Sequence, residues 1–433
     1  MYKESVYNIW ADDILFNSLS KSLVKFQPDE VQTVKSFLKK TDEYSENNQE
    51  YVEMFLKAGF ICAKDVDEFN FLKLMNKRST FANKEYQLTI NPTLQCNYRC
   101  WYCCVEEQQT KYENRRMDDS TVEKVKKLIH NLIVEDNIQK LHLDWFGGEP
   151  LMYYKEVVFP ISQYAHELCV KYRIPFFNHA TTNAYYINES MIESFKLIQL
   201  NSFQIPIDGK ENKHNYVKNM NGVGHFRQII QSINNLCHIM PDCHVVLRIN
   251  YDETTLDSID EIIPLISQDI RDRIDVDFQR VWQISIQKDN TGNNPTLLRV
   301  KNIFEKEGFN TLYFAYNSKQ FRCCYADSFY HWVINYDGNV FKCSARNYDS
   351  SLIAASINEN GYMEYKPIVY DYFSDTTFNN DQCAKCKLLP VCFGPCVQKR
   401  FENVYQGKPF QCLHDKSEIS ITQFIKDLYE QRH

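Results

Sequence analysis

Three cysteines within eight residues constrain this chain more than any other feature of its sequence. Cys96, Cys100 and Cys103 form the run Cys-x3-Cys-x2-Cys, directly after the strand-like stretch YQLTINPTL at 86–94. Three thiolates can hold three irons of a 4Fe–4S cube and leave the fourth iron open to a substrate or cofactor. Two other interpretations stay open, namely a Zn site, which normally takes four ligands, and buried cysteines without a ligand.

A second motif follows another strand-like stretch, KLHLDW at 140–145. Asp144–Pro150 reads DWFGGEP. A pair of glycines allows the backbone to approach a neighbouring group closely. Glu149 then offers a carboxylate at the C-terminal end of a strand, where α/β barrels place their chemistry.

Together the two motifs resemble the radical SAM superfamily, whose pattern is CxxxCxΦC followed by GGEP. The resemblance implies that the three cysteines ligate a 4Fe–4S cluster. It also implies four residues that bind S-adenosylmethionine, namely Tyr102 beside the adenine, and Gly147, Gly148 and Glu149 at the methionine ammonium. The reaction implied is reductive cleavage of S-adenosylmethionine to a 5′-deoxyadenosyl radical, which removes a hydrogen atom from an unactivated C–H bond.

Length and composition exclude several classes of protein. The 433 residues suffice for two or three domains, and 44% of them are hydrophobic. The net charge of −7 argues against a nucleic-acid partner. We find no apolar run of the roughly 18–20 residues that span a bilayer, and no signal-peptide layout at the N-terminus. We therefore expect a cytoplasmic protein without a membrane partner, in which 16 cysteines serve metal or redox chemistry.

Residues 86–283 repeat a strand-then-helix rhythm that predicts an α/β fold. Ser120-x-x-Glu123 has the spacing of a capping box and predicts the start of the first helix, 120–135. Six β/α units predict a parallel, partly closed (β/α)6 barrel, as the resemblance also implies. Its open side would admit a large substrate. The expected strands are 86–93, 140–146, 175–182, 202–208, 243–250 and 274–282, and further helices are expected at 226–236, 258–267 and 297–309.

Residues 1–85 form a separate piece with helical patterns at 29–40 and 48–60. Their layout resembles the winged-helix peptide-recognition domain that precedes the barrel in many radical SAM peptide maturases. Such a domain binds a leader peptide by adding a strand to a sheet edge. A purely structural N-terminal cap is the alternative.

The region that follows the barrel, 311–433, is rich in cysteine. Cys324-x13-Gly338-x4-Cys343 is followed by a Cys-x2-Cys-x5-Cys-x3-Cys run and a final cysteine, and 335–343 reads as a hairpin with Asp337-Gly338 at its turn. The pattern resembles the SPASM extension of radical SAM enzymes. Zn binding by the CxxC pair is the alternative.

The SPASM resemblance implies two auxiliary 4Fe–4S clusters, which makes three clusters in total. Cys323 is the nearest candidate for a fourth inner ligand, and an open iron is the other possibility. The implied ligands of the outer cluster are Cys383, Cys386, Cys392 and Cys412, and those of the inner cluster are Cys324, Cys343 and Cys396.

Later strands carry weaker family hints. Ala184 and Pro206 stand where the family usually has Gly and Ser. Expected cofactor-pocket residues are Thr182, Asn183, Asp208 and Arg248, with simple strand-end structure as the alternative for each. Gln279, Arg280 or Gln283 could face the substrate. The five remaining cysteines are expected to be core thiols, namely Cys62, Cys104, Cys169, Cys237 and Cys243.

The resemblance leaves two related functions. A peptide maturase would install a thioether or carbon–carbon crosslink in a ribosomally made precursor, and an anaerobic sulfatase maturase would form formylglycine. The long N-terminal piece favours the peptide maturase, as does Ser344, which follows Cys343 where the sulfatase maturases carry an Asp base. Expected partners are the precursor peptide and an electron donor such as flavodoxin or ferredoxin. A Zn-binding adaptor without enzymatic activity would not explain GGEP.

Overall fold

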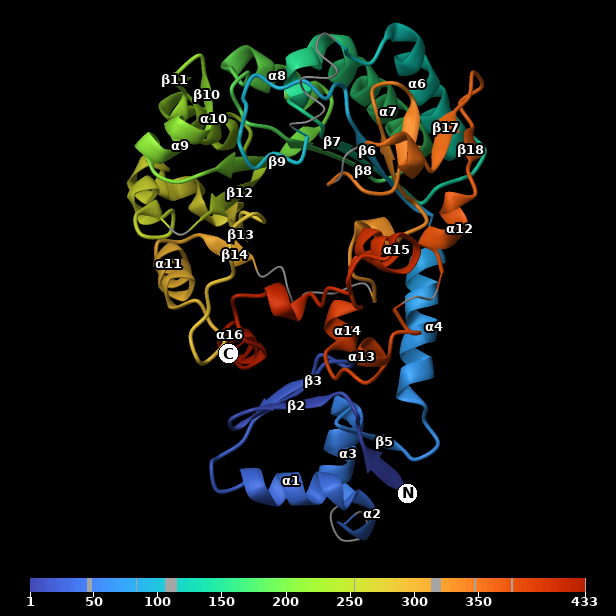
Figure 1. Cartoon of the computed structure of the whole chain (residues 1–433), viewed down its shortest axis with the longest axis vertical. Coiled ribbons are helices and arrows are strands. Elements are labelled where there is room, and N and C mark those ends of the chain that lie inside the picture. The colour runs from blue at the N-terminus through green and yellow to red at the C-terminus, as the bar shows by residue number, and fades with distance from the viewer. Residues whose placement is uncertain are drawn as a thin grey trace.

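One large sheet organises the molecule. The structure, a computed structural model, describes residues 1–44, 49–82, 84–105, 115–252, 254–312, 321–345, 348–374 and 377–432. The sheet has eleven strands in the order β14-β13-β12-β9-β8-β7-β6-β15-β16-β17-β18 and is strongly curved (Figure 1). All six predicted strands are confirmed as its parallel core: β6 Glu85–Ile90, β7 Lys140–Trp145, β8 Phe176–Thr181, β9 Leu200–Ile207, β12 His244–Tyr251 and β13 Ile274–Arg280.

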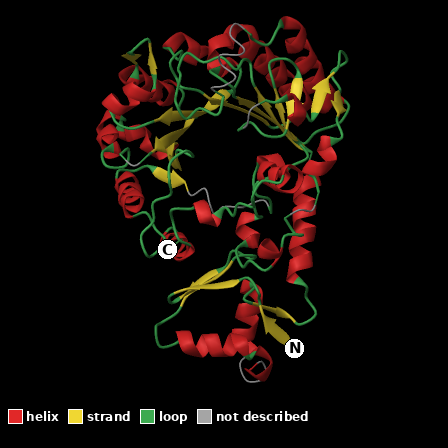
Figure 2. Cartoon of the chain, in the orientation of Figure 1, coloured by secondary structure: helices red, strands yellow, loops and turns green. Residues whose placement is uncertain are grey.

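Helices cover the convex face of this sheet (Figure 2). The alternation of side chains along each strand explains why. In β7, Leu141, Leu143 and Trp145 are fully buried, whereas His142 and Asp144 point to the concave side and are only partly buried. The covering helices are α6 Asp119–Val134, α7 Phe159–Tyr172, α8 Glu189–Leu197, α10 Phe226–Ile239 and α11 Pro295–Lys306.

Two details of the helix predictions are wrong. Helix α6 begins one residue before Ser120, and the Asp118 carboxylate caps it by accepting a hydrogen bond from the Thr121 N–H at 2.7 Å. The segment 258–267 forms a 3-10 helix over Ile259–Leu265 instead of an α-helix. Pro264 has no N–H and disfavours a regular α-helix there.

The Cys-rich region continues the barrel sheet. Strand β14 (Asn310–Leu312) adds to β13, and β15 (His331–Ile334) pairs in parallel with β6. The predicted hairpin is confirmed, because β15 and β16 (Asn339–Phe341) pair antiparallel across Gly338, whose φ is +79°. The sheet ends with β17 Ala355–Ile357 and β18 Met363–Tyr365.

The N-terminal region (residues 1–85) carries small antiparallel sheets and short helices. Helix α4 (Glu68–Phe81) leads from it towards the barrel (Figure 1). Its strands are β2 Asn8–Ala11, β3 Ile14–Asn17 and β4 Leu23–Lys25 in one sheet and β1 Tyr2–Glu4 with β5 Ile61–Ala63 in another, and its other helices are α1 Val31–Lys39, α2 Thr41–Tyr44 and α3 Gln49–Ala58.

The sheet β2–β3–β4 is covered on both faces. Leu15 packs with the region's own helices, whereas Ala11, Ile14 and Phe16 share a core with helix α16 (Ile421–Glu430). The Cys-rich region therefore lies between the N-terminal region and the barrel (Figure 1). Its other helices are α12 Ile368–Tyr372, α13 Asp381–Ala384, α14 Leu389–Cys392 and α15 Val397–Gln406.

Several short elements complete the chain. Among the described helices, none combines the length and apolar character needed to cross a membrane. The short elements are α9 Glu211–Val217, β10 Asn219–Met220, β11 Val223–Gly224 and the short 3-10 or π helices η1 Pro150–Tyr153, η2 Tyr154–Val158, η4 Gln268–Arg273, η5 Tyr325–Asp327, η6 Ser350–Leu352 and η7 His414–Lys416.

Candidate active site

The two sequence motifs lie side by side at the C-terminal ends of β6 and β7. Their backbones are joined by hydrogen bonds from the Gly148 N–H to the Thr93 carbonyl (3.0 Å) and from the Glu149 N–H to the Gln95 carbonyl (2.7 Å). These bonds continue the pairing of β6 with β7 beyond the strands. The cysteine loop and the GGE segment are thus held as one unit.

Glycine is required at both positions of the pair. A Cβ on Gly148 would lie 1.8 Å from the Gln95 carbonyl oxygen, and one on Gly147 would lie 2.4 Å from that of Thr93. Gly147 also has a φ of +109°, which side chains disfavour. The glycines therefore allow the segment to lie directly against the base of the cysteine loop.

Glu149 is completely buried behind these glycines. Its carboxylate accepts hydrogen bonds from the Leu151 N–H (2.9 Å), the Thr182 hydroxyl (2.7 Å) and the Asn183 N–H (2.8 Å). Burial nevertheless raises the pKa of Glu149 to about 7, because the three donors offset only part of the cost of removing the charge from water. A cation bound nearby would favour the ionised carboxylate.

The three cysteines of the loop are close to one another and to this carboxylate. The Asn183 side-chain amide lies 3.7 Å from the Cys96 sulfur, and the Tyr98 N–H lies 3.4 Å from it. Burial raises the pKa of the Cys100 thiol to about 11 and also raises that of Cys96, whose further causes include Glu149, Cys100 and Cys103. A metal that binds thiolates would compensate this cost of ionisation.

No three His, Cys, Asp or Glu side chains among the described residues are arranged around a single ion. A 4Fe–4S cube distributes its cysteine ligands over several irons. Proximity of thiols around a shared space is therefore the relevant geometry for such a cluster.

A buried polar network lies on the other side of the cysteine loop. Asp208, at the end of β9, contacts both the Tyr102 hydroxyl and the Lys218 ammonium, and Lys218 lies 2.7 Å from the same hydroxyl. The Asn250 amide of β12 also donates to the Tyr102 hydroxyl, at 3.0 Å. Sequence reasoning predicted Tyr102 and Asp208 but missed Lys218, a cation that follows Asp208 by ten residues.

Arg248 joins this network through Asn250. Its Nε donates to the Asn250 side-chain oxygen at 3.2 Å, and its Nη1 lies 3.8 Å from an Asp277 oxygen. Gln279 donates to Asp277 at 2.7 Å. The structure therefore links Arg248 to Tyr102 through Asn250, and it places Gln279 beside Arg248 through their shared contact with Asp277.

The concave face carries titratable side chains that sequence reasoning did not single out. His142 Nε2 lies 3.1 Å from one Asp144 oxygen, and Gln87 donates to the other. His179 is paired with Ser202 at 2.9 Å. Although burial would raise it, the pKa of Asp144 is lowered to about 2 by hydrogen bonding and charge from His142 and by the charge of His179. Asp144 is therefore a fixed negative charge inside the barrel.

The four cysteines expected to hold an outer cluster are close together in the structure. Burial raises the pKa of Cys383 to about 11 and that of Cys392 to about 12, and in both cases nearby thiols raise it further. For Cys383 these are Cys386 and Cys412, and for Cys392 they are Cys386, Cys383 and Cys412. The four thiols therefore lie within electrostatic range of one another, although Cys412 is distant in sequence.

The expected inner set is less compact. The Cys323 and Cys324 thiols are hydrogen-bonded to each other, and Cys396 lies within electrostatic range of Cys323. Both backbone N–H groups of the pair donate to Asp327, at 2.8 and 3.1 Å. Cys343 lies near the Tyr325 ring, whose hydroxyl is 2.8 Å from the Ser344 hydroxyl.

Comparison with known proteins now assigns the barrel. Residues 90–266, which span both motifs and the polar network, match the Radical SAM superfamily. The chain carries a radical SAM domain. It is an enzyme, and a radical SAM domain implies a 4Fe–4S cluster and S-adenosylmethionine as cofactors. No curated protein sequence matches the chain.

Solved structures agree with the radical SAM fold. The structure of anSMEcpe with bound AdoMet is similar at 16% identity and a TM-score of 0.59, covering 80% of this chain and 94% of that one. The structure of Streptococcus suis SuiB bound to precursor peptide SuiA is similar at 16% identity and a TM-score of 0.52, covering 92% of this chain and 96% of that one. At such low identity these likenesses establish the fold.

The residues of this radical SAM domain fit the implied cofactors. The glycine cradle, the half-neutral Glu149 and the clustered thiols of 96–103 provide soft ligands and a carboxylate for a cationic group. The network around Tyr102 adds hydrogen-bond donors and acceptors at the same loop. The GGE segment and the Tyr102 network therefore both contact the cysteine loop.

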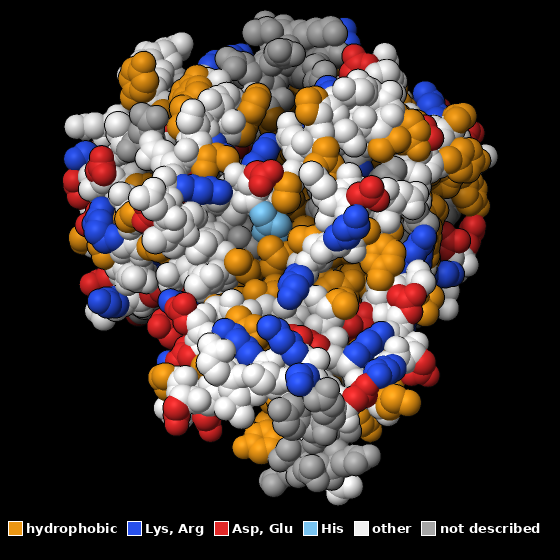
Figure 3. Space-filling model, turned by 60° about the horizontal axis from the view of Figure 1, so that its bottom comes forward, with side chains coloured by type: hydrophobic (Ala, Val, Ile, Leu, Met, Phe, Trp, Pro, Cys, Tyr) orange, Lys and Arg blue, Asp and Glu red, His pale blue; other side chains and the backbone are white. Residues whose placement is uncertain are grey.

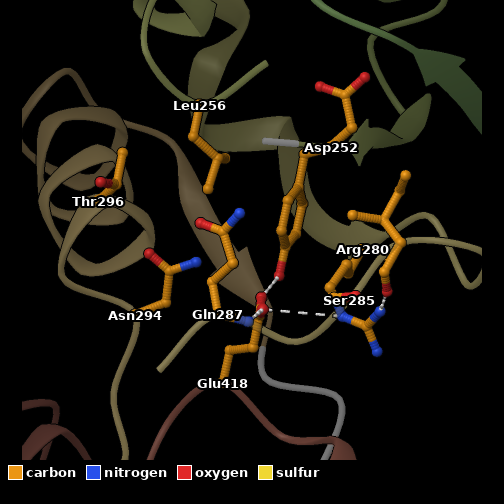
Figure 4. Close-up of a pocket in the computed structure, with 10 residues that line it drawn as sticks. Asp252, Leu256, Arg280, Ser285, Gln287, Asn294, Thr296 and Glu418 are labelled. Atoms are coloured by element: carbon orange, nitrogen blue, oxygen red, sulfur yellow. Dashed lines mark hydrogen bonds and ion pairs between the residues drawn. The ribbon is translucent and has the colours of Figure 1, made fainter. Parts of the chain in front are cut away.

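Arg280 was expected as a possible substrate contact, but its side chain lies beside Glu418. It forms part of a small pocket between the rim of the radical SAM domain and residues that precede helix α16 (Figure 4). The Glu418 carboxylate accepts hydrogen bonds from the Tyr251 hydroxyl and from the Gln287 N–H (2.7 Å), and Arg280 Nε lies 3.7 Å away. Gln283 is exposed. We therefore interpret these contacts as structural, because they join the radical SAM domain to the segment that precedes helix α16.

The five cysteines outside the expected ligand sets differ in how deeply they are buried. Cys169, Cys237 and Cys243 are buried, as expected of core thiols, and Cys62 is partly buried. The expectation for Cys104 is wrong, because its side chain is exposed. It directly follows Cys103, and successive side chains of this loop cannot all face the interior.

Proposed function

We propose that the protein is a radical SAM peptide maturase that forms a thioether or carbon–carbon crosslink in a ribosomally made precursor. The observation that carries this proposal is one continuous arrangement. An N-terminal region with an accessible sheet edge packs on a field of clustered cysteines, which in turn borders the open side of a radical SAM barrel. This arrangement supports a large peptide substrate and an electron acceptor close to the barrel.

In this proposal Cys96, Cys100 and Cys103 hold the cluster of the barrel. When bound, that cluster and S-adenosylmethionine supply a 5′-deoxyadenosyl radical. Glu149 and the backbone of Gly147 and Gly148 receive the ammonium of S-adenosylmethionine, and Thr182 and Asn183 hold the Glu149 carboxylate in place.

The second half of the cofactor pocket is formed by Tyr102, Asp208, Lys218 and Arg248. Tyr102 lies beside the adenine, and the Lys218 ammonium and the Arg248 guanidinium offer charge to a carboxylate. Their partners Asp208 and Asn250 orient them before the cofactor arrives. Such preorganisation reduces the cost of ordering side chains upon binding.

The Cys-rich region would hold two auxiliary 4Fe–4S clusters that accept the surplus electron. The outer cluster takes Cys383, Cys386, Cys392 and Cys412. The inner cluster takes Cys324, Cys343 and Cys396, and the proximity of Cys323 to Cys396 supports Cys323 as its fourth ligand. A small reductant protein such as flavodoxin or ferredoxin would supply electrons.

The leader of the precursor would dock on β4. The sheet β2–β3–β4 has two edges, and at the β2 edge Lys387 donates to the Asn8 carbonyl at 3.0 Å. Strand β4 pairs only with β3 among the described strands, is partly buried at Leu23 and Val24 and is exposed at Lys25, so its outer edge can accept an added strand. Lys and Arg side chains gather over the N-terminal part of the face in Figure 3, which suits an acidic leader.

A sulfatase maturase is the second candidate, since anSMEcpe is among the similar structures. In such an enzyme we would expect an acidic side chain directly after Cys343. Here Ser344 occupies that position and bonds to Tyr325 at 2.8 Å. The peptide maturase therefore agrees better with the residues of this chain.

Iron counting after anaerobic reconstitution tests the cofactor assignment. The proposal predicts about twelve irons in the wild type and about eight in the Cys96→Ala/Cys100→Ala/Cys103→Ala variant, which should also lose S-adenosylmethionine cleavage. Cys104→Ala changes the exposed neighbour and serves as the matched control. About four irons together with Zn in the wild type would contradict the auxiliary clusters.

Peptide docking needs a separate test. Short peptides encoded beside the gene can be screened for binding to the wild type and to Lys25→Glu. We expect binding to weaken in Lys25→Glu, with S-adenosylmethionine cleavage unchanged. Equal binding by both proteins would argue against docking on β4.

A further inference from the structure

The outer group of cysteines is enclosed partly by the N-terminal region. Cys383 belongs to a buried apolar cluster that also contains Tyr7 and Leu72 from the N-terminal region, and Cys386 packs against it. Leu19 and Phe69 pack against the same cluster. The wall around these thiols is therefore built by two regions that are far apart in sequence.

Polar contacts fix the position of the N-terminal region on this wall. The Ser18 hydroxyl donates to the Lys387 carbonyl at 2.5 Å, and the Lys21 ammonium donates to the Pro390 carbonyl at 2.7 Å. In return, the Lys387 ammonium reaches the Asn8 carbonyl. The segment 387–390 lies between Cys386 and Cys392, so the loop that carries Lys21 covers the cysteine run itself.

Tyr7 brings an unused hydrogen-bond donor to this site. Its side chain is 2% exposed, and its hydroxyl has no hydrogen-bond partner within the described chain. Burial raises the pKa of Tyr7, and the charges of Glu68, Asp67 and Cys386 raise it further. A buried donor without a partner is costly, which indicates that an acceptor is missing from this space.

The nearby carboxylate does not serve as that acceptor. One Glu68 oxygen accepts from the Ser5 hydroxyl at 2.5 Å, and the other accepts from the Val6 N–H at 3.0 Å. The Tyr7 backbone is also satisfied, because its carbonyl accepts from the Ser18 N–H. No described cysteine sulfur lies within hydrogen-bonding distance of this hydroxyl, but Cys386 is near enough to act on it electrostatically. A sulfur of a cluster bound by these cysteines is therefore the acceptor that fits this space.

Lys21 contributes a positive charge to the same site. It is partly buried in a left-handed backbone conformation (φ +63°), and Cys392 lies within electrostatic range of it. Burial lowers the pKa of Lys21 to about 7, whereas neighbouring negative charge raises it. A cluster bound by four thiolates would provide that negative charge.

We propose that Tyr7 and Lys21 belong to the environment of the iron–sulfur cluster held by Cys383, Cys386, Cys392 and Cys412, where Tyr7 donates its O–H to a sulfur and Lys21 places a cation beside the thiolates. The inference rests on the outer cluster of the proposed function. Hydrogen bonds to sulfur and nearby positive charge both stabilise the reduced cluster, so both residues raise its reduction potential. The N-terminal region then tunes the electron acceptor as well as docking the peptide.

Redox titration of the reconstituted full-length enzyme, followed by electron paramagnetic resonance, tests this inference. The signal of the outer cluster is the one lost in Cys383→Ala. We expect its midpoint potential to be more negative in Tyr7→Phe and in Lys21→Met, to fall further in the double variant, and to stay near the wild-type value in Lys21→Arg. Tyr2→Phe and Lys39→Met alter the same region away from the cysteines and should leave the potential unchanged.

The outcomes separate the two levels of the proposal. An outer-cluster signal whose potential is unchanged in Tyr7→Phe and Lys21→Met overturns the inference and leaves the proposed function intact. Equal shifts in Tyr2→Phe and Lys39→Met also overturn it, because the effect would then be general. A wild-type protein that cleaves S-adenosylmethionine but loses neither iron nor a paramagnetic signal in Cys383→Ala refutes the outer cluster, and the inference with it.

Discussion

Lys218 and Asp208 form an ion pair that is almost fully buried, with 3% and 2% of their side chains exposed. The hydroxyl of Tyr102 contacts both of them, which ties the cysteine loop to the end of β9. On its other side the same loop is bonded to the GGE segment. The loop that carries the three cysteines is therefore anchored from two directions before any cofactor binds.

Lys218→Met should lower the free energy of unfolding by about 3–5 kcal/mol, because it leaves the Asp208 carboxylate buried without a partner. Adding Asp208→Asn should recover part of this loss. Urea denaturation of the metal-free protein measures both. Lys213→Met is the control, since its ion pair with Asp252 is partly exposed and should contribute about 1 kcal/mol or less. Equal losses in Lys218→Met and Lys213→Met would contradict the buried pair.

The pKa of Glu149 gives a pH dependence of cofactor binding. Burial raises it to about 7, so the carboxyl group is mainly neutral below this pH, whereas the ammonium of S-adenosylmethionine requires the ionised form. Between pH 5.5 and 7 the affinity should rise by up to about tenfold per pH unit, while an α-amino group with a pKa of about 7.7–8.0 stays protonated. Equilibrium dialysis across this range measures it, and Glu149→Gln should remove the slope.

The same shift also affects stability. Because the folded-state pKa lies above the unfolded value, the folded protein binds more protons between about pH 4.5 and 7, and the free energy of unfolding falls as the pH rises through this window. Glu149→Gln should flatten that decline in the metal-free protein. If the free energy of unfolding declines with pH just as steeply in Glu149→Gln, other titratable groups cause the decline.

Gly148→Ala should weaken S-adenosylmethionine binding at least about tenfold, or about 1.4 kcal/mol. The added Cβ meets the Gln95 carbonyl oxygen at 1.8 Å and separates the two motifs. Gly407→Ala is the matched control, because Gly407 has a φ of +66° but open space around its Cβ position. It should reduce stability without changing the affinity. Unaltered binding by Gly148→Ala would mean that the contact between the motifs is dispensable.

Asp144→Asn should lower the free energy of unfolding at pH 7 by about 2 kcal/mol. This is the stabilisation that corresponds to lowering the pKa of Asp144 from 3.8 to about 2. The stabilisation is complete above the unfolded pKa and is lost as the pH falls through about 2, so the difference between variant and wild type should shrink in acid. Urea denaturation at pH 7 and pH 3 compares them. A difference that grows at pH 3 would exclude the ionised carboxylate as its source.

The six parallel strands were predictable because each is a short apolar run with its own flanking turn or helix signals, and such signals are local. The failure at 258–267 is also local in origin, because Pro264 interrupts an otherwise helical pattern of apolar residues. Cys104 shows the limit of assigning burial by residue type alone.

The site was predictable only where residues lie in a motif. Cys96 and Glu149 stand in spaced signatures, whereas the pairing of Lys218 with Tyr102 depends on how a turn after helix α9 folds back onto a distant loop. His142 and Asp144 alternate along a strand, but sequence alone does not reveal that Gln87 of the neighbouring strand β6 donates a hydrogen bond to Asp144. Tyr7 reaches the cysteines only through the packing of two regions.

The shared core of β2, β3 and helix α16 has a consequence for biosynthesis. Ala11, Ile14 and Phe16 emerge from the ribosome early, yet Phe424 and Ile425, which cover them, are made only after the whole barrel. One face of the first sheet must therefore stay uncovered during translation, and its closure brings together contacts of very long sequence separation, which form slowly. Under the proposed function, the outer cysteines would be accessible to incoming iron and sulfide until that closure, so the order of synthesis would leave an interval for loading metal before the N-terminal region covers them.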